Sequence, residues 1–107
     1  MTISRYEEKE PTSSEVETRS GPAVIQFGND WCGFCQRAQP FIVAAMEQHP
    51  EIPHWYIADS SGKPLGRYFR VKLWPTLIFL LDGKEITRVV RPDNTSVIQE
   101  ALAKICT

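Results

Sequence analysis

The sequence predicts an α/β protein, with one mixed β-sheet covered by helices on both faces. Residues 23–27 form a near-continuous apolar run of strand length, as expected of a central strand that is buried on both sides. Strand-like and helix-like segments then alternate along the chain, which is typical of layered α/β folds. Residues 76–81 and 84–90 form two further strand-like runs joined by Asp82-Gly83, a dipeptide that favours a tight hairpin.

Length and composition indicate a single globular domain spanning residues 1–107, with residues 1–20 the least defined part. The chain is 42% hydrophobic and 23% charged, with a net charge of −1, which are ordinary values for a soluble domain. It has neither a basic stripe that would attract nucleic acid nor an apolar run of membrane-spanning length. Residues 1–20 are polar and lack the apolar core of a signal peptide, so we expect a cytoplasmic protein whose thiols are kept reduced.

The residues before the central strand carry only weak indications of secondary structure. Residues 2–6 could form an edge strand or remain frayed. Capping-box patterns begin at both Thr12 and Ser14, so we expect a short helix over about residues 14–19. Ser20-Gly21-Pro22 ends that helix, the strand at residues 23–27 follows, and residues 28–30 turn the chain outward.

A longer helix is predicted over residues 36–49. Its apolar residues are spaced for one buried face: Ala38, Phe41, Ile42, Ala45 and Met46. Pro40 lies inside this segment and should remove one backbone hydrogen bond and kink the helix, while Pro50 and Pro53 end it.

The second half of the chain completes the order β, α, β, α, β, β, α. Residues 54–58 predict an aromatic-rich strand, and residues 63–69 predict a short helix at best. The hairpin of residues 76–90 follows. Ser96 and Gln99 fit a capping box at the start of a last helix, whose apolar stripe is Val97, Ile98, Ala101, Leu102 and Ile105.

The motif Trp31-Cys32-Gly33-Phe34-Cys35 lies at the junction between the central strand and the long helix. Two cysteines with this spacing and in this place predict a redox dithiol. A thiolate at a helix N-terminus is stabilised by unpaired backbone N–H groups and by the helix dipole. We therefore expect Cys32 to attack, and the more buried Cys35 to resolve the mixed disulfide by forming the Cys32–Cys35 disulfide.

Two other interpretations of the cysteine pair are weaker. A structural zinc site needs four nitrogen or sulfur ligands, and Cys106, His49 and His54 lack the paired spacing of such sites, so we expect no bound metal. A purely structural disulfide would close so short a loop that it would stabilise the fold little. Cys106, in the last helical turn, is expected to be a bystander.

Trp74-Pro75-Thr76 stands at the start of the most apolar strand. A proline there removes a hydrogen-bond donor from the sheet. One explanation is a cis peptide bond that presses a bend against another part of the fold. The other is an ordinary trans proline at a strand start.

Together these residues resemble the thioredoxin family. The Trp-Cys-Gly-Phe-Cys motif, Pro40, Pro75-Thr76 and Asp82-Gly83 occur in the family's order and at close to its spacing, from about Gly21 to the C-terminus. The resemblance implies a sheet of four to five strands and a cis Pro75 that faces the dithiol. It also implies that Trp74 holds substrate through its backbone and that Trp31 packs beside the site.

Within the motif and beneath it, the chain departs from the family pattern. Phe34 stands where thioredoxins usually have proline, and Gln26 replaces the buried aspartate that is thought to carry the proton of the resolving thiol. The lysine that usually neighbours that aspartate falls at His54 or Trp55. Gln26 cannot take a proton at neutral pH, and it is either part of the catalytic apparatus or a hydrogen-bonded core residue.

Two more departures lie near the expected substrate groove. Trp74 replaces a usual isoleucine, and Arg91 replaces a usual glycine. Arg91 could help to hold Cys32 as a thiolate, but a loop arginine more often points into solvent, and we expect the latter.

The predicted function is a thiol-disulfide oxidoreductase that reduces protein disulfides as a monomer. Electrons would come from a separate disulfide reductase, because the chain has no Gly-rich dinucleotide loop and implies no cofactor of its own. One alternative is a more oxidising isomerase or oxidase, given Phe34 and the missing carboxylate. The other is a protein-binding adaptor that docks a partner through Trp31, Phe34 and Trp74 with little redox turnover.

Overall fold

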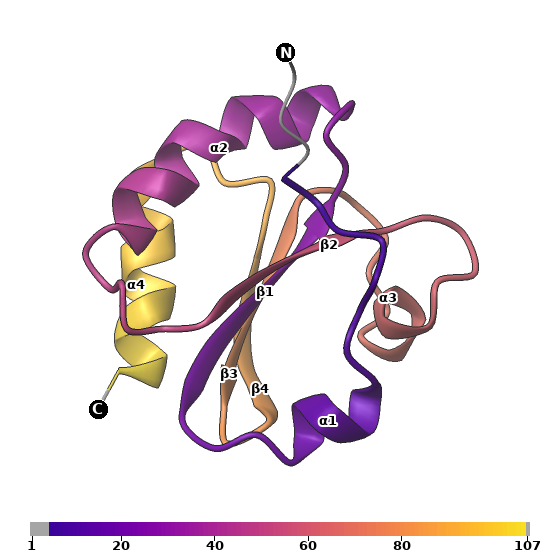
Figure 1. Cartoon of the computed structure of the whole chain (residues 1–107). Coiled ribbons are helices and arrows are strands. Elements are labelled where there is room, and N and C mark those ends of the chain that lie inside the picture. The colour runs from indigo at the N-terminus through magenta and orange to yellow at the C-terminus, as the bar shows by residue number, and fades with distance from the viewer. Residues whose placement is uncertain (1–4, 107) are drawn as a thin grey trace.

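The computed structural model describes residues 5–106 and forms a four-stranded sheet with helices on both faces (Figure 1). The α/β fold class predicted from the sequence is therefore confirmed, with four strands. The elements, in chain order, are α1 (Ser13–Glu17), β1 (Pro22–Gly28), α2 (Gly33–Met46), β2 (His54–Ala58), α3 (Pro64–Tyr68), β3 (Thr76–Leu81), β4 (Lys84–Val90) and α4 (Thr95–Ile105).

The strand order is β2-β1-β3-β4, so the first strand of the sequence is central. β1 pairs in parallel with β2 and antiparallel with β3, and β3 pairs antiparallel with β4. Asp82 and Gly83, between β3 and β4, both have positive φ angles of 52° and 79°, as a two-residue hairpin turn requires.

The alternation of side chains along β1 divides the interior into two cores. Val24 packs with α2 and α4 on one face, whereas Ala23, Ile25 and Phe27 pack with α1 and α3 on the other. Figure 1 shows α2 and α4 on the left of the sheet and α1 and α3 on the right. Gln26 shares the face of Val24, so a polar side chain lies beneath α2.

The helix boundaries correct several predictions. α1 begins after Thr12, whose capping box with Glu15 is formed, so the first of the two candidate boxes is the one used. α4 begins at Thr95 and is capped by Asn94 rather than by Ser96, because the Asn94 side chain accepts the Val97 N–H at 3.0 Å. α2 begins three residues earlier than predicted and ends at Met46, three residues before His49; it runs through Pro40 without interruption.

The N-terminal segment lies along β2 through a single bridge between Glu7 and Ile57. Glu7 N donates to Tyr56 O at 2.9 Å, and Ala58 N donates to Glu7 O at 2.8 Å. The edge strand predicted at residues 2–6 lies largely outside the described residues. The bridge nevertheless fixes the residue before it, Tyr6, which is buried.

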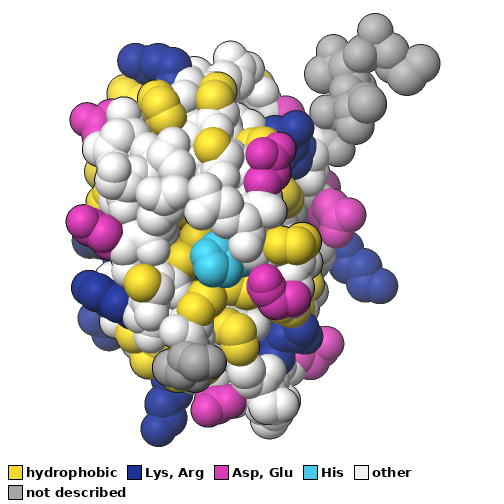
Figure 2. Space-filling view, turned by 90° about the vertical axis from the view of Figure 1, so that its left-hand side faces the viewer, with side chains coloured by type: hydrophobic (Ala, Val, Ile, Leu, Met, Phe, Trp, Pro, Cys, Tyr) yellow, Lys and Arg dark blue, Asp and Glu magenta, His cyan; other side chains and the backbone are white. Residues whose placement is uncertain are grey.

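On the side covered by α2 and α4, acidic and basic side chains are interspersed around the margin of the molecule and neither sign dominates (Figure 2). Among residues 5–106, no helix is long and apolar enough to cross a membrane.

Candidate active site

Cys32 caps the N-terminus of α2. Its backbone is extended, and its sulfur accepts a hydrogen bond from Cys35 N at 3.3 Å. This cap explains the early start of the helix, since the thiol takes the place of the oxygen that usually caps a helix. Both cysteines are free thiols, 8% and 2% exposed respectively, so Cys32 is the more accessible of the pair.

The Cys35 thiol is held in its protonated form. Burial, together with a hydrogen bond to Cys32, raises its pKa to about 12. Two hydrogen bonds act in the opposite direction and favour the thiolate, one involving the backbone of Asn29 and one involving the Tyr6 side chain. The pair therefore consists of an outer thiol at a helix N-terminus and an inner thiol that keeps its proton at neutral pH.

The loop before β3 lies beside the dithiol. The Trp74–Pro75 peptide bond is cis, the isomer that the family resemblance implied. The buried Thr76 donates its hydroxyl to Leu73 O at 2.6 Å, and Arg91 N donates to Pro75 O at 2.9 Å. The loop is therefore fixed from β3 and from the end of β4.

The two tryptophans meet edge to face. Their ring centroids are 5.8 Å apart, with the planes at 84°. Trp74 Nε1 donates to the buried carboxylate of Asp59 at 2.9 Å, and Gly66 leaves the space that this carboxylate fills. The hydrogen bond to Asp59 thus fixes the orientation of the Trp74 ring, whereas Trp31 is 72% exposed beside the thiols.

Arg91 does not point into solvent, so that prediction is wrong. Its guanidinium carbon lies 3.7 Å from the centroid of the Phe34 ring, and its Nε donates to Trp74 O at 2.9 Å. Arg37 also lies over Phe34, at 4.6 Å. The 44% exposed Phe34 ring attracts both cations through its π-face, which a proline at this position would not offer.

These side chains border a cleft of about 410 Å³. Its lining is largely apolar, with two cations at the rim, and consists of Phe34, Arg37, Ala38, Phe41, Arg91, Pro92 and Asp93. Gly33, the middle of the motif, is exposed at the first helical position, and a Cβ there would meet open space.

Beneath the dithiol, Gln26 is fully buried and fully hydrogen-bonded. Its Nε2 donates to Tyr6 OH at 2.6 Å and to Gln39 Oε1 at 3.2 Å, and its Oε1 accepts from His54 Nε2 at 2.9 Å. Gln39 in turn donates to Tyr56 OH at 2.9 Å. Of the two residues that could replace the lysine expected beside position 26, His54 is the one that contacts Gln26, because Trp55 packs on the opposite face of the sheet.

His54 is neutral in this network. Burial and the nearby Arg5 lower its pKa from 6.5 to about 4. An amide oxygen can only accept, so the proton of the neutral ring is on Nε2. The Gln26–His54 pair therefore replaces a charged pair by a neutral one, without leaving either polar group unpaired.

The residue that the sequence did not indicate is Tyr6. Its hydroxyl accepts from Gln26 Nε2 at 2.6 Å. Its side chain packs in one buried cluster with Cys35, where a hydrogen bond between the two lowers the pKa of the Cys35 thiol. A Cβ on Gly28 would lie 2.6 Å from Cys35 Sγ and 2.8 Å from Tyr6 OH, so this glycine makes room for the contact. Gly28 was a signal available in the sequence, because a glycine within a strand often marks a close approach.

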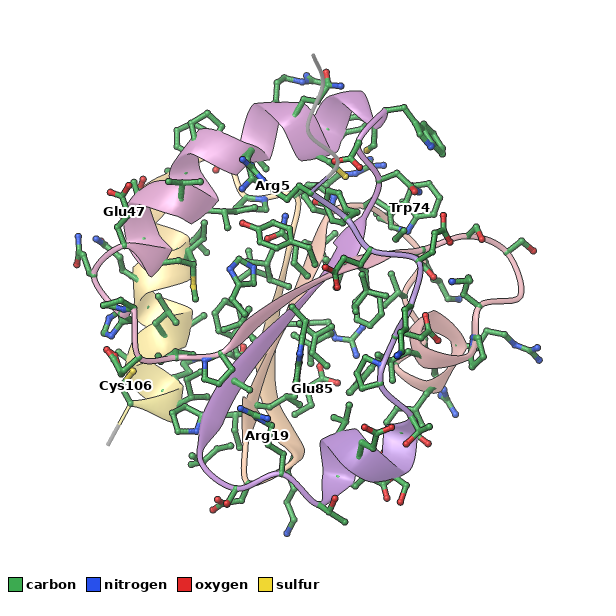
Figure 3. The ribbon with its side chains drawn as sticks, viewed as in Figure 1. Arg5, Arg19, Glu47, Trp74, Glu85 and Cys106 are labelled. Atoms are coloured by element: carbon green, nitrogen blue, oxygen red, sulfur yellow. The ribbon has the colours of Figure 1, made fainter. Side chains whose placement is uncertain are left out.

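The remaining metal-ligand candidates are not gathered at this site. Cys106 Sγ lies 3.7 Å from His49 Nδ1. Cys106 lies at the end of α4, at the opposite end of the molecule from Trp74 (Figure 3). In the part of the chain that the structure describes, no three His, Cys, Asp or Glu side chains are grouped so as to hold a metal ion.

Comparisons with known proteins agree with this geometry. The family model for Thioredoxin matches residues 5–104. The chain is 40% identical over 85 residues to a thioredoxin of Chlamydia trachomatis serovar D, covering 75% of this chain and 79% of that protein. It is 34% identical over 80 residues to Thioredoxin-2 of Saccharomyces cerevisiae, covering 75% and 76%. It superposes on the reduced form of thioredoxin 2 from Pseudomonas aeruginosa PAO1 with a TM-score of 0.84 and 46% identity, over 94% of each chain. The chain therefore belongs to the thioredoxin family.

Proposed function

We propose that the chain reduces disulfide bonds in proteins through a dithiol–disulfide cycle of Cys32 and Cys35. The observation that carries the proposal is the asymmetry of the two thiols. Cys32 caps α2 and is the more accessible, while Cys35 lies behind it with its proton held. One thiol is thus placed to meet a substrate, and the other is withheld until the first bond has formed.

In the first step the Cys32 thiolate attacks a substrate disulfide. A bond forms between Cys32 Sγ and one substrate sulfur, and the other substrate sulfur leaves as a thiolate and is protonated by water. In the second step Cys35 loses its proton to water and attacks Cys32 Sγ. The Cys32–Cys35 disulfide forms, the substrate sulfur leaves, and the substrate has gained two electrons.

A separate disulfide reductase would return the pair to the dithiol form. We further propose a monomeric protein acting in the cytoplasm, where a reducing poise favours this direction of electron flow. The exposed Trp31 and Phe34 supply the surface on which a substrate would be held.

Serine variants test the mechanism. Cys32→Ser should abolish reduction of a disulfide-bonded protein, whereas Cys35→Ser should accumulate a mixed disulfide visible by non-reducing electrophoresis and mass spectrometry. Both are best made in a Cys106→Ser background, so that the third thiol does not react. Full turnover by Cys32→Ser would contradict the mechanism.

The direction of electron flow is tested by the reduction potential, measured by equilibration with glutathione buffers and thiol alkylation. A reductase should lie near the thioredoxin value of about −270 mV. A value of about −180 to −120 mV would instead identify a more oxidising isomerase or oxidase.

A protein-binding adaptor is the second candidate, favoured by the exposed aromatic side chains beside the thiols. Trp31 is 72% and Phe34 is 44% exposed, and aromatic residues are common anchors at interfaces. A partner complex that persists in Cys32→Ala would support the adaptor over the enzyme. Loss of the complex in that variant would support the enzyme.

A further inference from the structure

Cys35 must be deprotonated before it can resolve a mixed disulfide, yet its surroundings contain no buried carboxylate from β1. The position beneath it is occupied by Gln26, which neither accepts nor releases a proton at neutral pH. Gln26 instead bonds to Tyr6. The group of this network that meets the Cys35 sulfur is the Tyr6 hydroxyl.

We propose that Tyr6 is a catalytic residue of the resolving step, in which its hydroxyl donates a hydrogen bond to Cys35 Sγ and stabilises the attacking thiolate. The inference rests on the proposed function and assigns a role within it. It concerns a residue outside the dithiol motif and outside the four strands of the sheet.

The direction of the hydrogen bonds supports a donating Tyr6. His54 Nε2 donates to Gln26 Oε1, so the Gln26 amide nitrogen faces Tyr6 and donates to its oxygen at 2.6 Å. The hydrogen bond between Tyr6 and Cys35 lowers the pKa of the Cys35 thiol, which is the effect of a hydroxyl that donates to the thiolate. The hydrogen bonds therefore all run in one direction: His54 donates to Gln26, Gln26 donates to Tyr6, and Tyr6 donates to the Cys35 sulfur.

Tyr6 keeps its own proton. Burial and the neighbouring Cys35 raise the pKa of the Tyr6 hydroxyl far above its usual value of 10.0, so the phenol acts as a hydrogen-bond donor and not as a base. The Cys35 proton leaves through another route. A cleft of about 230 Å³ reaches Cys35 and is lined by Arg5, Tyr6, Asn29, Asp30, Cys35, Gln36 and Gln39. It is large enough to admit water, and these side chains offer that water hydrogen-bond partners.

The Cys35 proton passes to water in this cleft, and the sulfur retains the electron pair under the Tyr6 and Asn29 hydrogen bonds. That pair forms the bond to Cys32 Sγ, the bond from Cys32 Sγ to the substrate sulfur breaks, and the substrate thiolate is protonated by solvent. Tyr6 is unchanged at the end of the cycle.

The position of Tyr6 is specified by three contacts. The bridge at Glu7 holds the segment against β2, the Tyr6 and Tyr56 rings pack edge to face at 5.5 Å, and Gly28 leaves the space in which the sulfur and hydroxyl meet. Tyr6 is 7% exposed, so the hydrogen bond forms away from bulk solvent.

The test separates the two chemical steps. Dithiobis(nitrobenzoate) releases one coloured thiolate when Cys32 attacks and a second when Cys35 resolves the mixed disulfide, so stopped-flow absorbance resolves both phases in a Cys106→Ser background. Tyr6→Phe keeps the ring and removes the hydroxyl. Losing a hydrogen bond to a charged group should reduce the thiolate about 10- to 100-fold.

A less acidic thiol gives a more nucleophilic thiolate, which recovers about half of that loss on a logarithmic scale. The second phase of Tyr6→Phe should therefore slow roughly 3- to 10-fold, with the first phase unchanged. The rate of the second phase rises with pH as Cys35 loses its proton, and in Tyr6→Phe this rise should occur at higher pH. The ionisable groups around the pair are Cys32, Asp30, Arg5, Tyr56 and His54, and all remain in the variant.

The control is Tyr68→Phe, which removes the exposed hydroxyl that bonds Glu17 on the other side of the molecule and should change neither phase. Replacing Tyr6 by 3-fluorotyrosine, which retains the hydroxyl and makes it more acidic, should speed the second phase and gives a second test should Tyr6→Phe fold poorly. A purely structural role would alter the melting temperature and leave the pH profile in place.

An unchanged second phase in a folded Tyr6→Phe, or equal slowing of both phases, would overturn the inference. Absence of the first phase in the unaltered dithiol would overturn the proposed function itself. The two failures are therefore distinguishable in one experiment.

Discussion

Arg91 is held against Phe34 although its own backbone is in an unfavourable conformation. The guanidinium lies 3.7 Å from the ring centroid, while the Arg91 φ angle is 49°, in the left-handed region that favours glycine. Residues with other side chains occupy this region at a cost, and such positions are concentrated at functional sites. The contacts of the side chain with the aromatic ring and with the carbonyl of Trp74 offset this cost.

The first prediction concerns substrate charge. Arg91 and Arg37 place two cations at the rim of the cleft beside the dithiol, so peptides with acidic residues next to the disulfide should react faster than neutral ones. Arg91→Gln should lower kcat/KM for the acidic peptide by roughly 2- to 5-fold, as expected for a surface charge pair, and leave the neutral peptide unaffected.

Lys104→Gln is the matched control, because it removes the same charge from the last turn of α4. The two variants should differ on the acidic peptide only. Equal losses in both would assign the effect to net charge and contradict a role for the Arg91 side chain.

The second prediction concerns Gly28. A Cβ there would lie 2.6 Å from Cys35 Sγ, so Gly28→Ala should lower the free energy of unfolding by about 1–3 kcal/mol through overpacking. It should also slow the resolving step, since the sulfur and the Tyr6 hydroxyl must separate. Urea denaturation measures the first effect. Gly33→Ala, whose Cβ meets open space, should leave stability unchanged or slightly raised.

The third prediction is a pH dependence of stability. The pKa of His54 is lowered from 6.5 to about 4 in the folded protein. Between these two pH values the unfolded chain binds a proton on His54, whereas the folded chain does not. Stability is therefore lost as pH falls. The loss should be roughly 2 kcal/mol between about pH 7 and about pH 5.

Comparison with His54→Gln isolates this contribution from the carboxylates. Glutamine can donate to Gln26 Oε1 and does not titrate, so the variant should lose less stability over the same interval in urea denaturation. Parallel pH curves for the two proteins would show that His54 is not the group responsible.

The fourth prediction concerns Gln26→Asp. The carboxylate cannot donate to Tyr6 and would instead accept from it, which would withdraw the Tyr6 hydrogen bond from Cys35. The rate of resolution should fall severalfold while the rate of the first attack by Cys32 changes little. Stopped-flow absorbance with a small aromatic disulfide gives both rates, and equal effects on the two steps would contradict the assignment of this position.

The sequence predicted β2, β3 and β4 to the residue, because apolar runs and Asp82-Gly83 are local signals. The start of α2 was misplaced because its cap is the Cys32 thiol, and sulfur is not a usual capping group. The start of the last helix was misplaced by two residues because two polar residues, Asn94 and Ser96, each offer a plausible cap.

The dithiol, Pro75 and the replacement of the buried charge at Gln26 were visible in the sequence, whereas the contacts of Tyr6 and Arg91 were not. Tyr6 lies in a segment without periodicity, and its place is set by a bridge to a strand 50 residues later, Glu7 to Ile57. Arg91 was expected in solvent because a loop arginine usually is. Its position depends on a ring in α2 that is distant in sequence.

The bridge at Glu7 also has a practical consequence for handling the protein. Removing the chain through Tyr6, or fusing another domain close to it, would disturb a residue that touches the inner sulfur while leaving the Cys-Gly-Phe-Cys motif and the sheet intact. The Cys32 thiol of such a protein would still be placed to attack disulfides, but its mixed disulfides would be resolved slowly. A purification tag at the C-terminal end, beyond α4 and far from Trp74 (Figure 3), would leave the contact between Tyr6 and Cys35 undisturbed.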